Sequence, residues 1–183
     1  REPIESIEVV NFDTLVLWSW LVPVLPLVGA IINAVLRRSL SGNTSGGFAT
    51  LMVLGSFLVS LLLFMGHDPA AHPVMVVKFF DWINVGGMEI PFAFQIDALS
   101  LTMMLIVTGV GSLIHLYSVG YMHDDKRVAT FFAMLNLFTF AMLLLVMGAN
   151  YLITFIGWEG VGLCSYLLIG FWYTNTEFNY AAR

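Results

Sequence analysis

Charged residues are scarce in this chain. Only 10% of its 183 residues are Asp, Glu, Lys or Arg, whereas 59% are hydrophobic, and the mean hydropathy is +0.89. Soluble domains carry about 25% charged residues, so this composition excludes an ordinary soluble domain. We expect an integral membrane protein whose long apolar segments leave little length for a separate soluble domain.

Cysteine and basic clusters are equally scarce. The one cysteine, Cys164, has no partner for an intrachain disulfide, and the four histidines lack a metal-binding spacing such as HExxH. The seven Lys and Arg residues form no cluster longer than a pair, and the net charge is −5, which argues against binding to nucleic acid. We therefore expect no metal, no cofactor and no redox centre in this chain, and no nucleic-acid partner.

Five apolar segments are long enough to cross the hydrocarbon core, which takes about 20 helical residues. They cover residues 15–36, 48–66, 97–119, 129–148 and 149–172. The first contains Pro23 and Pro26, which predict a kink, and residues 39–47 are expected to form a short flexible connection. We therefore expect one all-α transmembrane domain over residues 1–183.

The longest connection, residues 67–96, predicts a β-hairpin. Apolar and polar residues alternate on both sides of Gly86-Gly87, which is typical of two strands joined by a tight turn. Pro91 suggests an edge strand, because proline cannot donate to a ladder. We expect the hairpin to lie on the membrane surface with its apolar face over helix ends, and Asp97 to cap the helix that follows.

Positive charges are distributed unevenly between the two sides of the predicted membrane domain. Five of the seven Lys and Arg residues follow the first, third and fifth spans, namely Arg37, Arg38, Lys126, Arg127 and Arg183, and the other side has only Arg1 and Lys78. By the positive-inside rule we expect the N terminus outside and residues 173–183 inside. Because the first 13 residues are acidic rather than basic, we expect no intact signal peptide there.

The fifth span carries a single carboxylate, Glu159, about ten residues from either end. A glutamate at that depth does not easily reach the headgroups, so it must be paired, protonated or hydrated inside protein. An ionisable residue within the membrane is a candidate functional residue, here a proton site. The alternative is a neutral glutamate that one neighbour holds and that contributes only to packing.

The helical positions around Glu159 predict contacts with protein on two sides. Gly157, Gly160 and Cys164 share a face of small residues on which another helix can approach closely. Gly162 and Tyr166 lie on the side of Glu159 itself and offer space and a hydroxyl group. We therefore count Tyr166 among the candidates for a proton path.

The third span carries a polar row in an otherwise apolar helix. Thr108, Ser112 and His115 are spaced at i, i+4 and i+7 and are further candidates for a proton path, since the ordinary pKa of histidine lies near neutrality. The alternative for His115 is a structural, hydrogen-bonded histidine. In the fourth span we expect Asn136 to bond across helices rather than to conduct protons.

Two runs of sequence resemble a known family, FQIDALSLTMMLIVTGVGSLIHLYSVGYM and NYLITFIGWEGVGLCSYLLIGFW. The chain resembles the N-terminal part of subunit L of the proton-pumping NADH:quinone oxidoreductase, respiratory complex I, called subunit 5 in mitochondria. The match is most specific over residues 92–175. In that family the glutamate of GWEGVGLCSYLLIGFW is the essential proton-site acid, which carries onto Glu159. Family members are much longer and place its lysine partner in a later helix, whereas no lysine lies inside a span here.

The resemblance implies a proton-translocating membrane subunit that couples quinone reduction by NADH to proton pumping. It implies NADH, FMN, iron–sulfur clusters and quinone in partner subunits, other membrane subunits of complex I as partners, and the bacterial inner (plasma) membrane or the mitochondrial inner membrane as location. Multisubunit cation/proton antiporters share much of the pattern, so an antiporter subunit is the alternative. A purely structural scaffold with a neutral Glu159 is the third hypothesis.

Overall fold

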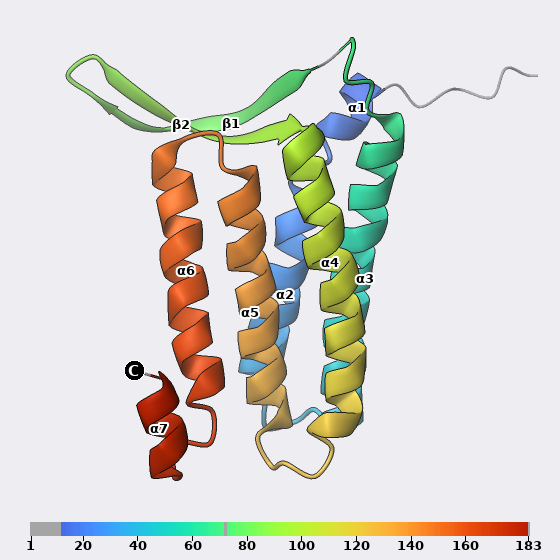
Figure 1. Ribbon diagram of the computed structural model, residues 1–183, viewed down its shortest axis with the longest axis vertical. Coiled ribbons are helices and arrows are strands. Elements are labelled where there is room, and N and C mark those ends of the chain that lie inside the picture. The colour runs from blue at the N-terminus through green and yellow to red at the C-terminus, as the bar shows by residue number, and fades with distance from the viewer. Residues whose placement is uncertain (1–11, 72, 183) are drawn as a thin grey trace, which may run out of the picture.

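A computed structural model describes residues 12–71 and 73–182, and in this part of the chain long antiparallel helices stand side by side under a β-hairpin (Figure 1). The helices are α1 (Phe12–Val16), α2 (Leu21–Val35), α3 (Gly42–Gly66), α4 (Ala98–Tyr121), α5 (Val128–Met147), α6 (Tyr151–Ile169) and α7 (Thr176–Ala182), and the strands are β1 (Val74–Val85) and β2 (Met88–Asp97). Five described segments are long and apolar enough to cross a membrane, the first running from Thr14 to Val35 across α1 and α2. The predicted fold class, an all-α membrane protein with a hairpin between the second and third spans, is confirmed.

The first span is interrupted before its prolines rather than at them. Residues 17–20 form turns in which Trp18 and Ser19 donate to carbonyls three residues earlier, Leu15 and Val16. Pro23 has no N–H, and its ring would clash with the carbonyl of residue 19 in a continuous helix. The break therefore falls one turn before the predicted kink, and Pro26 is accommodated inside α2.

The second span begins earlier than predicted. Residues 42–47 were expected to belong to a flexible connection, and this is wrong, because α3 starts at Gly42. The hydroxyl of Ser41 accepts a hydrogen bond from the Thr44 N–H at 3.3 Å and caps the helix. One turn further on, the hydroxyl of Ser45 donates to the Asn33 amide oxygen of α2 at 2.5 Å, and this contact with α2 orders the start of α3.

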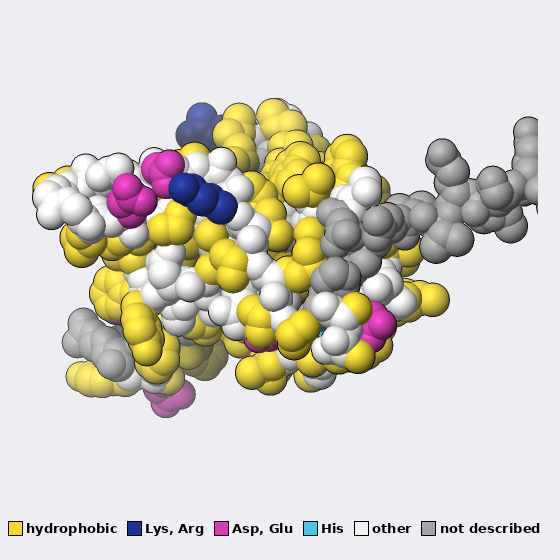
Figure 2. Space-filling model, turned by 90° about the horizontal axis from the view of Figure 1, so that it is seen from above, with side chains coloured by type: hydrophobic (Ala, Val, Ile, Leu, Met, Phe, Trp, Pro, Cys, Tyr) yellow, Lys and Arg dark blue, Asp and Glu magenta, His cyan; other side chains and the backbone are white. Residues whose placement is uncertain are grey.

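The hairpin has the predicted turn and covers helix ends. Gly86 and Gly87 both have positive φ angles, 61° and 88°, as a two-residue hairpin turn of this type requires. The part of the hairpin next to the helices contributes Val77, Phe94 and Ile96 to the main apolar core, whereas the tip extends past α6 and stays exposed (Figure 1). Seen from this end, charged side chains of both signs lie over the hairpin (Figure 2). Strand β1 carries the exposed ion pair of Lys78 and Asp81.

Asp97 joins the hairpin to α4 as predicted. Its carboxylate accepts a hydrogen bond from the Ser100 N–H at 2.7 Å, and the Ser100 hydroxyl accepts from the Asp97 N–H at 2.8 Å, which completes a capping box. Burial raises the pKa of Asp97, but the hydrogen bonds from Ser100 and Gln95 outweigh it and leave the pKa below its usual value. The N-cap prediction for Asp97 is confirmed.

The two ends of the bundle differ in charge. Arg37, Arg38, Lys126 and Arg127 lie in the connections at the end opposite the hairpin, and Lys78 lies on the hairpin. Arg1 and Arg183, which also entered the charge count, lie outside the described residues. The described helices thus place the basic connections on one side, as the predicted order of spans requires.

Candidate functional site

Helix α6, which carries Glu159, is fixed at its N-terminal end by the hairpin. The Asn150 side chain accepts a hydrogen bond from the Ile153 N–H at 3.1 Å and so caps α6, and its amide group donates to the Pro91 carbonyl of β2 at 2.8 Å. The Ala149 N–H donates to the Ala93 carbonyl at 3.1 Å. The turn between α5 and α6 is therefore hydrogen-bonded to the hairpin. The Asn150 side chain both caps α6 and bonds to the hairpin.

Replacing Asn150 separates these two contacts. In Asn150→Asp the carboxylate still accepts from the Ile153 N–H but cannot donate to Pro91, whereas Asn150→Ala loses both interactions, each worth about 1 kcal/mol. We expect faster amide hydrogen exchange in residues 91–97 for both variants, and faster exchange in the first turn of α6 for the alanine variant alone. Equal effects of both variants on α6 would contradict this division of roles.

At its C-terminal end, α6 is held by the connection between α4 and α5. The guanidinium of Arg127 donates to the Phe171 carbonyl at 2.8 Å and lies 4.5 Å from the centre of the Phe171 ring. The Trp172 indole N–H donates to the Asp125 carboxylate at 2.8 Å. Burial raises the pKa of Asp125, but hydrogen bonds from the Arg127 N–H and from Trp172, together with the charge of Arg127, hold the pKa below its usual value.

The lowered pKa of Asp125 predicts how acid affects this contact. Because folding favours the ionised carboxylate, its contribution to stability is complete above its ordinary pKa of about 3.9 and is lost as the pH falls through the folded-state value. We expect Asp125→Asn to lower the thermal stability of the assembled protein at neutral pH, and the difference from wild type to shrink below about pH 4. Asp124→Asn is the matched control, since Asp124 is exposed and its carboxylate bonds, among the described residues, to the adjacent His123 alone. A difference that stays constant into acid would contradict the assignment.

The small-residue face of α6 packs directly on α5, as predicted. A Cβ atom at Gly157 would lie 2.4 Å from the backbone nitrogen of Leu145, and one at Gly160 would lie 2.9 Å from the Ala141 Cβ. Cys164, one turn further along, is buried. Glycine at position 157 therefore allows a close approach of two backbones that any side chain would prevent.

Glu159 lies on the open side of α6. It is the ninth of the helix's 19 residues, and its side chain is exposed on the isolated chain, as are Gly162 and Tyr166 on the same side. A Cβ at Gly162 would meet no atom within 4 Å. Among the described residues no hydrogen bond or ion pair reaches the Glu159 carboxylate. The acid thus sits at mid-depth on a helix face that α5 does not cover.

The polar row of α4 is buried elsewhere in the bundle. Thr108 and Ser112 donate to backbone carbonyls one turn back, Met104 and Thr108, each at 2.6 Å. His115 is 1% exposed, and its ring nitrogens lie 2.8 Å from the Gly111 carbonyl and 2.9 Å from the Asn136 side-chain oxygen on α5. Asn136 thus bonds across helices, as predicted. If Nδ1 carries the proton donated to Gly111, the Asn136 amide must be turned so that its NH₂ group faces Nε2.

The structure brings Tyr166 to Glu159's side but keeps the row of His115, Ser112 and Thr108 apart from it. Helix α5 stands between α6 and α4 (Figure 1). A second buried polar contact, between Asn33 and Ser45, links α2 to α3. Sequence reasoning missed this contact, although an asparagine inside the first apolar run was a visible signal.

Comparison with known proteins agrees with these features. Residues 82–132 match a family model described as NADH-ubiquinone oxidoreductase (complex I), chain 5 N-terminus, and residues 148–183 match one described as NADH:quinone oxidoreductase/Mrp antiporter, TM. The chain belongs to the family of complex I subunit L and chain 5. The second match includes Glu159 and all of α6, and the first includes β2 and α4. The match to a transmembrane family model and the five apolar helices together show that the chain is an integral membrane protein.

Named relatives extend the similarity over most of this chain. It is 44% identical over 168 residues to NADH-quinone oxidoreductase subunit L of Mycobacterium tuberculosis, 42% over 158 residues to subunit L of Rickettsia conorii, and 40% over 164 residues to NADH-ubiquinone oxidoreductase chain 5 of Allomyces macrogynus. These matches cover 91%, 86% and 86% of the chain but 26%, 24% and 25% of the relatives. The chain therefore spans about a quarter of the length of the relatives it matches.

Metal-binding groups do not occur in the described part of the chain, where no three His, Cys, Asp or Glu side chains come together. The candidate functional features of the described residues are a carboxylate halfway along α6, a buried polar row on α4, and contacts that hold both ends of α6.

Proposed function

We propose that this chain is part of a proton-translocating membrane subunit of an NADH:quinone oxidoreductase and that Glu159 is its proton site. The observation that carries the proposal is the position of Glu159, halfway along a membrane-spanning helix and within a family match to complex I and antiporter subunits. NADH, FMN, iron–sulfur clusters and quinone would be bound by partner subunits. Other membrane subunits of the complex and the lipid bilayer would surround this one.

Proton transfer at Glu159 would depend on its charge environment. An opposite charge close to a carboxylate favours ionisation, and removing that charge in a medium of low dielectric constant favours protonation. By family resemblance the opposite charge is a lysine of a later helix, which would face the open side of α6. The rigid attachment of α6 to α5, to the hairpin and to the Arg127 connection supports this proposal, because a fixed acid lets a moving charge change its protonation state.

Protons would reach Glu159 from the inner side, where we place residues 173–183, with the N terminus outside. Tyr166 lies two turns nearer to that end on the same side of α6 as Glu159. The row of His115, Ser112 and Thr108 stays in the proposal as a second polar route that meets α5 at Asn136. Because the hydroxyls of Ser112 and Thr108 donate to backbone carbonyls, transfer along this row requires the hydroxyls to rotate or water to enter.

A subunit of a multisubunit cation/proton antiporter is the second candidate, since the model matched by residues 148–183 is described for both kinds of protein. The two functions differ in their energy source. In inverted vesicles we expect NADH to drive proton uptake that an inhibitor of the NADH site stops. Cation-driven proton exchange that continues in the presence of this inhibitor and vanishes on loss of the subunit would favour the antiporter.

A further inference from the structure

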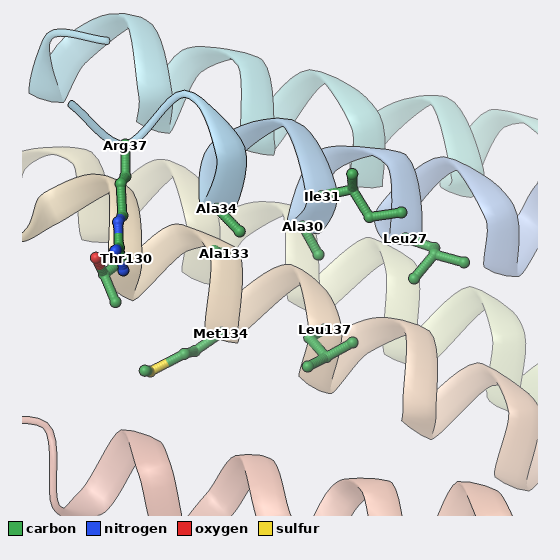
Figure 3. Close-up of a pocket in the computed structure, with 9 residues that line it drawn as sticks. All are labelled: Leu27, Ala30, Ile31, Ala34, Arg37, Thr130, Ala133, Met134 and Leu137. Carbon is green, nitrogen blue, oxygen red and sulfur yellow. The ribbon is translucent and has the colours of Figure 1, made fainter. Parts of the chain in front are cut away.

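An apolar groove runs along the seam between α2 and α5 at the inner end of the bundle (Figure 3). Its lining residues are Leu27, Ala30, Ile31, Ala34 and Arg37 from the α2 side and Thr130, Ala133, Met134 and Leu137 from α5. The three alanines leave the seam hollow, whereas larger side chains would fill it. Arg37 and Thr130 lie at one end of the groove, and Leu27 and Leu137 lie at the other (Figure 3).

The groove begins at Arg37, just beyond the end of the first span, and follows that span back to Leu27. Leu27 lies eight residues before Val35, where α2 ends, so at 1.5 Å per residue this part of the helix spans about 12 Å, and Arg37 follows two residues later. This is close to half of a hydrocarbon core of about 30 Å, which is the depth that one leaflet occupies. The groove has a volume of about 270 Å³, and its lining is apolar apart from Arg37 and Thr130.

The polar end of the groove carries a positive charge that no described residue binds. Arg37 is exposed and has no hydrogen bond or ion pair to any described residue. Thr130 adds a hydroxyl beside it. Anionic lipid headgroups concentrate on the cytoplasmic leaflet and are attracted to basic residues there, and a guanidinium binds phosphate in a bidentate manner. A second pocket, which shares Leu27 and continues toward the hairpin, has no charged residue in its lining.

We propose that the α2/α5 groove binds an anionic phospholipid of the inner leaflet, with one acyl chain along Ala30 and Ala34 and the phosphate on Arg37. The proposal is independent of any role of Glu159 in proton transfer. If the groove binds such a lipid, binding depends on the positive charge of Arg37 and not on that of its neighbour Arg38. A larger side chain at Ala34 blocks binding, whereas one at Val35, which is exposed and outside the groove, does not.

The test uses the full-length subunit in its assembled complex, in nanodiscs that contain phosphatidylglycerol or phosphatidylcholine with the same photoactivatable acyl chain. After illumination, mass spectrometry of peptides counts lipid adducts in residues 27–37 and 130–137. We expect several-fold more adducts from phosphatidylglycerol, a drop to the phosphatidylcholine level in Arg37→Gln but not in Arg38→Gln, and a loss of both in Ala34→Phe but not in Val35→Phe.

Two results would overturn the proposal. Equal labelling by both lipids, with no effect of Arg37→Gln, would mean that Arg37 does not bind the lipid phosphate. No adducts in the groove, while the exposed residues Leu51 and Leu58 of α3 are labelled, would mean that another polypeptide segment fills it. Each variant is compared at an equal amount of assembled complex, so that a loss of folding is not mistaken for a loss of binding.

Discussion

Glu159→Gln is expected to remove almost all NADH-driven proton uptake into inverted membrane vesicles while leaving the amount of assembled complex unchanged. Glutamine keeps the shape and polarity of the side chain but has no titratable proton, so it cannot alternate between a neutral and a charged form. Because Glu159 makes no hydrogen bond or ion pair with any described residue, the substitution breaks no polar contact within the described bundle. Proton uptake and NADH oxidation are measured in the same vesicles.

Two further carboxylate variants serve as controls for Glu159→Gln. Glu159→Asp keeps a titratable group on a shorter side chain and is expected to retain part of the uptake. Glu177→Gln removes a carboxylate from α7, where Glu177 is exposed, and is expected to behave as wild type. Unchanged proton uptake in Glu159→Gln would leave the glutamate as a packing residue and favour the scaffold hypothesis.

Gly157→Ala is expected to destabilise the assembled subunit by about 1–3 kcal/mol, the largest stability effect of any single-methyl addition considered. The new Cβ would lie 2.4 Å from the nitrogen and 2.7 Å from the Cα of Leu145. These are backbone atoms of α5, so relief requires a shift of the whole helix. The measurement is the midpoint of heat-induced loss of the assembled complex in detergent.

Gly47→Ala is the matched control for this effect. Gly47 lies in α3, and an added Cβ there meets no atom within 4 Å. It is expected to leave the midpoint unchanged or to raise it slightly, because alanine favours a helix over glycine. Equal behaviour of the two variants would mean that α5 and α6 do not approach as closely as described.

Features set by local sequence could be predicted. The alternation of residues around Gly86-Gly87 gave the hairpin, since a period of two and a positive-φ turn are properties of a short stretch. Asp97 was recognised as a cap for the same reason. The small face of Gly157, Gly160 and Cys164 indicated a close helix contact, although sequence alone did not say that the partner is α5.

Features that depend on distant residues could not be predicted. The start of α3 was mistaken for a loop because Gly46, Gly47 and the polar residues before them are typical of loops, and the contact of Ser45 with Asn33 depends on how α2 packs. The bond from Arg127 to the Phe171 carbonyl joins residues 44 positions apart. The open face of α6 around Glu159 depends on α5 packing against the other face, and no local pattern within α6 specifies that.

Infrared difference spectroscopy of the assembled complex, with and without NADH, can show whether Glu159 gains and loses a proton during turnover. A protonated carboxyl group has a C=O stretching band that a carboxylate lacks. We expect a carboxyl band that changes on addition of NADH in wild type and is missing from the difference spectrum of Glu159→Gln. Identical difference spectra from equal amounts of active wild type and variant would contradict it.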